Sequence, residues 1–100
     1  MAHFAELDPA NNSVLRVVVI SNDAIIDQDG NEREDLGIAL CKELYGTETK
    51  WVQTSYNANF RRYYAGYGFR YDEDHDVFIR PKPSGSNWTW DPESLDWIQG

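Results

Sequence analysis

The side chains best suited to recognition are aromatic, and they gather in the second half of the chain. Fourteen of the 100 residues are aromatic, and four of these are tryptophan. A domain of this size has a small core, so we expect surplus rings at the surface, where Tyr and Trp commonly anchor interfaces. One basic patch accompanies them, in which arginine is expected to pair with a carboxylate or with a partner. We predict a partner-binding surface made of Arg61, Arg62, Tyr63, Tyr67, Phe78, Trp88, Trp90 and Trp97.

Residue types that perform catalysis are present, but their spacing forms no recognisable catalytic motif. The sequence has no Gly-x-Ser-x-Gly elbow, no phosphate-binding loop and no dinucleotide fingerprint. His3 and His75 lie far apart, and neither has a metal-ligand partner at a typical spacing. The single cysteine, Cys41, excludes an internal disulfide and is expected to pack in the core. We therefore predict no enzymatic activity, no cofactor and no metal site.

Two acidic segments are expected to form polar turns. In the first, counting a calcium-binding loop from Asp27 puts Gly30 at position 4, whereas an EF-hand requires glycine at position 6. In the second, residues 72–76, alternate aspartates share a face only if the segment is extended. The sequence leaves open whether either segment binds a cation.

The charge of the chain limits its class of partner. Seventeen acidic residues against nine basic ones give a net charge of −8. Binding to nucleic acid or to an anionic membrane requires a basic surface, so we expect neither. No apolar run reaches the roughly 18–20 residues of a membrane-spanning helix. The first residues have neither the basic nor the apolar part of a secretory signal, so we expect none.

Local patterns predict the strands of the first half. Residues 3–7 and the β-branched run Val14–Ile20 predict a hairpin. Because Val14–Ile20 is almost entirely apolar, we expect it to be the central strand of its sheet. Residues 51–55 predict a third strand.

A helix is expected over residues 32–45. Asn31 is a suitable N-cap, and Glu34 would complete a capping box with it. Spacing of four residues predicts an apolar stripe formed by Leu36, Leu40 and Leu44. Gly46 is a residue type that commonly ends a helix.

The second half shows a repeated pattern. Residues 56–68 predict a turn or short helix followed by a glycine-bounded loop. Two later segments, residues 71–78 and 90–97, each begin with an aromatic residue and Asp, continue through a polar turn, and end on another aromatic residue. In a hairpin, such aromatic pairs face each other across the strands. We therefore predict two hairpins, with cross-strand pairs Tyr71–Phe78 and Trp90–Trp97.

Together these elements predict an α+β fold, with a single domain over residues 1–100. An N-terminal β-hairpin, one amphipathic helix and a strand form a core over residues 1–55, on a small, mostly antiparallel sheet. Residues 56–100 form an aromatic region of loops and hairpins.

Several motifs carry a resemblance to a known group of proteins. They are His3-Phe4-Ala5 with Leu7-Asp8, Val17-Val18-Val19 with Asn22, Gly37-Ile38-Ala39 with Cys41, Trp51-Val-Gln-Thr-Ser-Tyr-Asn-x-Asn-Phe-Arg61 with Tyr64-Ala-Gly66 and Gly68, Tyr71-Asp72, Asp76-x-Phe78-Ile79, and Pro81-Lys82-Pro83 with Trp88. Over nearly its full length the chain resembles short proteins of tailed phages of marine bacteria, especially cyanobacterial phages. After Trp90 it departs from that group, whose members often end in a Pro-rich tail. The resemblance implies a virion-associated protein and brings no catalytic residues.

Three functions from different classes follow. The first is a structural protein of a phage virion, made in the host cytoplasm, that binds other virion proteins as repeated copies or as a homo-oligomer. It would act as a capsid decoration protein or as a tail or fibre adaptor. The second is an early phage protein that inhibits an intracellular host factor. The third is a carbohydrate-binding module whose tryptophans stack on sugars. The sequence does not identify the partner protein.

Overall fold

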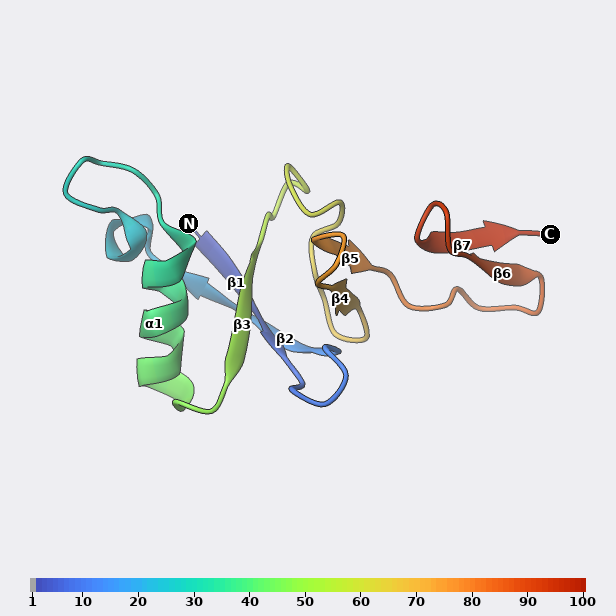
Figure 1. Cartoon of the computed structure of the whole chain (residues 1–100), viewed down its shortest axis with the longest axis horizontal. Helices are drawn as coiled ribbons and strands as arrows, with labels where there is room; N and C mark the ends of the chain where they lie inside the picture. The colour runs from blue at the N-terminus through green and yellow to red at the C-terminus, as the bar shows by residue number, and fades with distance from the viewer. Residues whose placement is uncertain (1) are drawn as a thin grey trace.

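Three strands of the first half form an antiparallel sheet in the order β2–β1–β3 (Figure 1). The computed structural model describes residues 2–100, in which β1 is Ala2–Leu7, β2 is Val14–Ile20 and β3 is Lys50–Thr54. The turn between β1 and β2 is closed locally, because the Asp8 side chain accepts a hydrogen bond from the backbone N–H of Ala10 at 2.9 Å. The predicted N-terminal hairpin and third strand are confirmed.

The prediction that Val14–Ile20 is the central strand is wrong. β1 is central: it pairs with β2 on one side and with β3 on the other, where Phe4 lies opposite Gln53. The apolar composition of β2 is explained in part by packing on both of its faces, although Leu15 and Val19 are exposed. Val18 and Ile20 pack in one hydrophobic cluster, and Val14 and Val17 pack in another on the opposite face.

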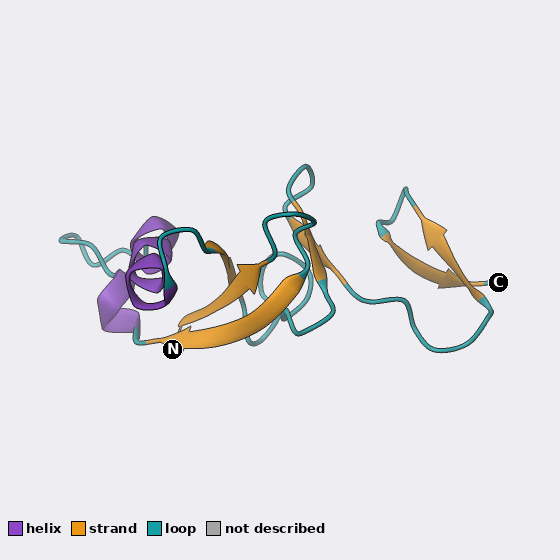
Figure 2. Cartoon of the chain, turned by 90° about the horizontal axis from the view of Figure 1, so that it is seen from below, coloured by secondary structure: helices purple, strands orange, loops and turns teal. Residues whose placement is uncertain are grey.

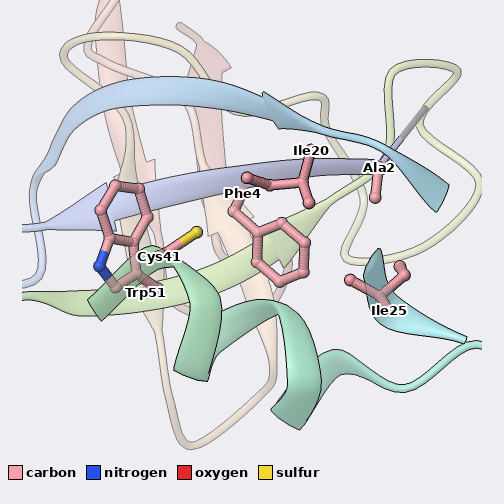
Figure 3. Packing of buried hydrophobic residues seen from close by; sticks show 6 residues of the cluster. All are labelled: Ala2, Phe4, Ile20, Ile25, Cys41 and Trp51. Atoms are coloured by element: carbon pink, nitrogen blue, oxygen red, sulfur yellow. The ribbon is translucent and has the colours of Figure 1, made fainter. Parts of the chain in front are cut away.

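Helix α1, Glu34–Tyr45, covers the first face of the sheet (Figure 3). Phe4 lies at the centre of this cluster, with Cys41 and Trp51 beside it, and Ile25 closes one end from the short 3-10 helix η1, Asn22–Ile25. The predicted burial of Cys41 is confirmed, since its side chain is fully buried. The other members of the cluster are Ala2 and Ile20, with Val18, Leu36, Ile38 and Leu40 packed against it.

The helix differs from the prediction in its start and in its buried side. It begins at Glu34, its N-cap is Arg33, and that residue makes no capping hydrogen bond with its side chain. The side facing the sheet is marked by Gly37 and Cys41, and Leu36 and Leu40 pack against the cluster as predicted. Leu44 is 60% exposed, so the predicted apolar stripe does not extend to the last turn of the helix. Gly37 allows this close approach: a Cβ there would lie 2.6 Å from Cε1 of Phe4.

The opposite face of the sheet is covered by residues 56–79. Hairpin β4–β5, formed by Arg70–Asp72 and Val77–Ile79, places Phe78 in the second cluster with Ala5, Val52 and Ala65. The predicted cross-strand pair Tyr71–Phe78 is confirmed, with ring centroids 5.4 Å apart. Residues 56–68 form turns and bends without a helix.

Hairpin β6–β7, formed by Trp88–Asp91 and Asp96–Gln99, lies at one end of the molecule beyond an irregular linker (Figures 1 and 2). This placement makes the protein elongated, at 50 × 26 × 21 Å, with a radius of gyration of 14.8 Å against about 13 Å for a compact chain of this length. The predicted α+β fold is confirmed. Within residues 2–100, no helix has the length and apolar character needed to span a membrane.

Candidate functional site

The three tryptophans of hairpin β6–β7 lie on one of its faces. Trp90 pairs directly with Trp97 across the strands, as predicted, and their rings meet edge to face with centroids 5.2 Å apart. Trp88 lies two residues before Trp90, so strand alternation directs it to the same face. All three side chains are partly exposed. The hairpin therefore presents a partly exposed aromatic face.

Arg80 fastens this hairpin to the rest of the protein. Its Nε donates to Oδ1 of Asp96 at 2.7 Å, and its Nη2 donates to the carbonyl of Trp97 at 2.9 Å. In return, Nε1 of Trp97 donates to the carbonyl of Arg80 at 3.0 Å. A two-stranded hairpin is marginally stable alone, so these reciprocal bonds hold the tryptophan face in place.

Two residues of the predicted surface also hold the hairpin. The Tyr63 hydroxyl donates to Oδ2 of Asp96 at 2.7 Å, and Nη1 of Arg62 donates to the carbonyl of Leu95 at the same distance. Burial acts to raise the pKa of Asp96, but the hydrogen bonds from Tyr63 and Arg80 outweigh it and hold that pKa below its ordinary value. Asp96 is therefore an ionised anchor at neutral pH.

A cleft of about 450 Å³ lies between hairpins β4–β5 and β6–β7. One wall includes the cross-strand pair Arg70–Ile79, and another includes the pair Trp90–Trp97. The linker between the two hairpins contributes Arg80, Pro81 and Lys82, and Ser13 and Gly68 complete the lining. We call this site the hairpin cleft.

The hairpin cleft is basic although the protein is acidic. Arg80 is paired with Asp96, but among residues 2–100 neither Arg70 nor Lys82 forms an ion pair. Both are exposed, and Nζ of Lys82 lies 5.9 Å from the centroid of the Trp97 ring. The cleft therefore offers two uncompensated positive charges beside two indole rings.

The basic part of this cleft is not evident from the sequence pattern. Arg70, Arg80 and Lys82 were not among the predicted binding residues. The position of Arg70 could have been predicted, because extending the predicted hairpin 71–78 by one residue pair brings Arg70 opposite Ile79. The position of Lys82 next to the tryptophans depends on how the two hairpins pack, which the sequence pattern does not show.

Arg61 belongs to the interior of the protein. Its Nη1 donates to Oε2 of Glu34 and to the carbonyl of Gln53, and its Nε donates to Oδ1 of Asp76, all at 2.7 Å. The side chain is only 16% exposed. The expectation that this arginine pairs with carboxylates is confirmed, and its guanidinium is unavailable as a free binding group.

The remaining predicted residues are divided between the core and the surface. Phe78 is fully buried in the second cluster, which corrects its predicted place on a binding surface: hairpin β4–β5 packs on the sheet and places this ring in the cluster with Val14 and Val52. Tyr67 is 84% exposed and lies outside the lining of the hairpin cleft. The structure thus brings together Trp90 and Trp97 in the cleft, with Trp88 on the same face.

In both acidic turns, a carboxylate accepts hydrogen bonds from backbone N–H groups of the same turn. Oδ1 of Asp27 accepts from the N–H groups of Asp29 and Asn31, each at 2.9 Å, and Oδ1 of Asp72 accepts from those of Asp74 and His75. Over residues 2–100, no group of three or more His, Cys, Asp or Glu side chains is placed to hold a metal ion.

Comparison with known proteins gives no relative: no protein-family model, curated protein or solved structure matches the chain. The resemblance to marine phage proteins therefore stays a prediction.

Proposed function

We propose that this protein is a structural component of a tailed-phage virion that binds other virion proteins through its C-terminal half. It acts as a capsid decoration protein or as an adaptor on the tail or fibres. The observation that carries the proposal is the tryptophan face of hairpin β6–β7, which lies at one end of an elongated molecule and is held there by Arg80. Partly exposed tryptophans on a fixed support are typical anchors of protein interfaces.

The charge and size of the protein support this role. A net charge of −8 favours solubility of a particle that carries many copies on its outside. A small contact surface is sufficient in a virion, because each copy is bound to a repeated lattice and modest affinities combine through avidity.

The two alternatives have less support from the geometry. Inhibition of a host factor relied on an accessible Arg-aromatic patch, but Arg61 is bound to Glu34 and Asp76 of its own chain. A carbohydrate-binding module relied on Trp88 and Trp90 as sugar platforms. The Trp88 ring is already contacted by a cation of the same chain, since the guanidinium carbon of Arg80 lies 5.4 Å from its centroid.

The decisive experiment is incorporation of Trp90→Ala into particles. Trp90 is preferred to Trp97 because its indole N–H has no hydrogen bond to the rest of the chain in the described residues. Particles of the phage that encodes the protein are purified, and the copies per particle are measured by quantitative mass spectrometry. The matched control is Leu44→Ala, which removes an exposed apolar side chain on α1, away from the hairpin.

We expect wild-type protein and Leu44→Ala at the same fixed stoichiometry, and Trp90→Ala to bind at least about 30-fold more weakly, as for an interface hot spot. The thermal unfolding midpoint of Trp90→Ala should stay close to that of the wild type. Absence of the wild-type protein from particles would refute the virion role. Normal incorporation of Trp90→Ala would refute the assignment of the interface to this hairpin.

A further inference from the structure

We propose that the hairpin cleft binds an extended, acidic peptide segment of the partner protein. In this arrangement a carboxylate of the segment lies near Arg70 and Lys82, and an apolar side chain lies against Trp90 and Trp97. The inference deepens the proposed function and rests on it, because it gives the chemistry of the partner segment at the same end of the molecule.

Most basic side chains of the protein are paired with carboxylates of the same chain, and two that are not lie in the cleft. Five of the nine basic residues are neutralised by carboxylates of the same chain: Arg16, Arg33, Lys50, Arg61 and Arg80. Of the four that form no ion pair within residues 2–100, Arg70 and Lys82 line one cleft, whereas Lys42 lies on α1 and Arg62 binds a carbonyl. An acidic protein that leaves two neighbouring cations unpaired has a local site for a negative group.

The lining of the cleft combines cationic and aromatic side chains, which favours an extended peptide. An extended strand directs alternate side chains to opposite sides. Here Arg70 belongs to β4 and the indole rings belong to β6 and β7, whereas Lys82 of the linker adjoins the Trp97 ring at 5.9 Å. A segment in which acidic and apolar residues alternate can therefore direct a carboxylate toward Arg70 and an apolar side chain toward the indole rings, with Lys82 near both. A lone small anion would use the cations but leave the aromatic wall uncovered.

The electrostatics favour a peptide over a nucleic acid. Charges are screened beyond about 8 Å at physiological ionic strength, so a short peptide with a few carboxylates responds mainly to Arg70 and Lys82. A polyanion of greater length extends over the surrounding surface, where the net charge of −8 repels it. The cleft volume of about 450 Å³ accommodates a few side chains of such a peptide.

The test is a direct binding measurement on the full chain. The probe is a synthetic peptide of about seven residues in which aspartate alternates with leucine, labelled with fluorescein and followed by fluorescence anisotropy. A second peptide with asparagine in place of aspartate reports the contribution of charge. The protein variants are Arg70→Gln and Lys82→Gln, and the control is Lys42→Gln, which removes the same charge on α1, away from the cleft. Arg70, Lys82 and Lys42 form no ion pair with any residue from Ala2 to Gly100, so all three variants should fold normally, which circular dichroism verifies.

We expect saturable binding of the acidic probe, about tenfold weaker for Arg70→Gln and for Lys82→Gln, and within twofold of the wild type for Lys42→Gln. The asparagine peptide should bind more weakly than the acidic one, and added salt should lower the affinity of the protein for the acidic probe. Equal binding by all variants, or no binding of the acidic probe, would overturn the inference. Tighter binding of a single-stranded oligothymidylate than of the peptide would also overturn it, in favour of a nucleic-acid site.

The outcomes separate this inference from the proposed function. If Trp90→Ala is lost from particles while the acidic probe fails to bind, the cleft inference is wrong and the virion interface stands. If the probe binds as expected while the wild-type protein is absent from particles, the virion role is wrong and the peptide-binding cleft stands.

Discussion

Replacement of Arg61 by methionine is expected to destabilise the protein strongly, because this side chain joins three separate parts of the fold. It binds Glu34 at the start of α1, the carbonyl of Gln53 in β3, and Asp76 in the turn of hairpin β4–β5. Methionine has a similar length. Arg61 has a positive φ of 55°, and methionine has the same backbone preference against that angle as arginine, so the substitution adds no backbone strain of its own.

The size of the effect follows from burial. Removal of one partner from a buried ion pair typically costs about 3–5 kcal/mol, because the remaining charge is left without a partner. Here the Arg61 side chain is 16% exposed and that of Asp76 is 61% exposed, so water can reach the freed carboxylate of Asp76. We therefore expect a loss of about 2–3 kcal/mol in the free energy of unfolding, at the lower end of that range or just below it.

The assay is urea unfolding followed by tryptophan fluorescence, with Arg33→Met as the control. Arg33 also pairs with a carboxylate, Asp35, but both side chains are largely exposed, so the control should lose much less stability than Arg61→Met. If the two variants lose similar amounts of stability, or if Arg61→Met loses less than about 1 kcal/mol, the assignment of Arg61 as an internal link is refuted.

The same variant should change how stability depends on pH. Burial acts to raise the pKa of Asp76, but hydrogen bonds from Tyr71 and Arg61 outweigh it, and the pKa lies below its ordinary value in the folded protein. A lowered folded pKa stabilises the protein above the unfolded value of about 4, and that contribution is lost as the pH falls through the folded pKa. Arg61→Met should therefore show a shallower loss of stability below about pH 5 than the wild type.

Two further predictions concern the core under α1. Gly37→Ala should lower the free energy of unfolding by about 1–3 kcal/mol despite the better helix propensity of alanine, because its Cβ would clash with the Phe4 ring; a smaller loss in a Phe4→Leu background, measured by urea unfolding, would verify the cause. Burial raises the pKa of the Cys41 thiol to about 11, so Ellman's reagent at pH 8 should react only on unfolding. Rapid reaction of the native protein would contradict this.

Local patterns in the sequence were sufficient for most of the secondary structure. The two aromatic-turn-aromatic segments predicted both C-terminal hairpins with the correct pairs, Tyr71–Phe78 and Trp90–Trp97. These predictions succeeded because a short hairpin is set by the turn between its strands and by the residues directly opposite each other. The hydrophobic character of Cys41 likewise predicted its burial without reference to distant residues.

The start of the helix shows where local reasoning fails. Asn31 and Glu34 have the spacing of a capping box, yet the Glu34 carboxylate accepts from Arg61 and from the backbone N–H of Gln53, at 2.8 Å in the latter case. A stronger partner from a distant segment replaces the local cap, and the helix begins two residues later than predicted. Sequence spacing gives no sign of such a competitor.

By itself the sequence determined most of the elements, their apolar content, the surplus of aromatic rings and the acidic charge. Only the tertiary structure decided that β1 is central, that Phe78 belongs to the core, and that Arg70 and Lys82 lie beside Trp90 and Trp97 without an ion pair in the described part of the chain. The physical reason is that strand order and ion pairing depend on which distant segments come together. Arg61 is 27 residues from Glu34, and Arg80 is 16 from Asp96, so the choice of which charges are neutralised and which stay free belongs to the packed fold.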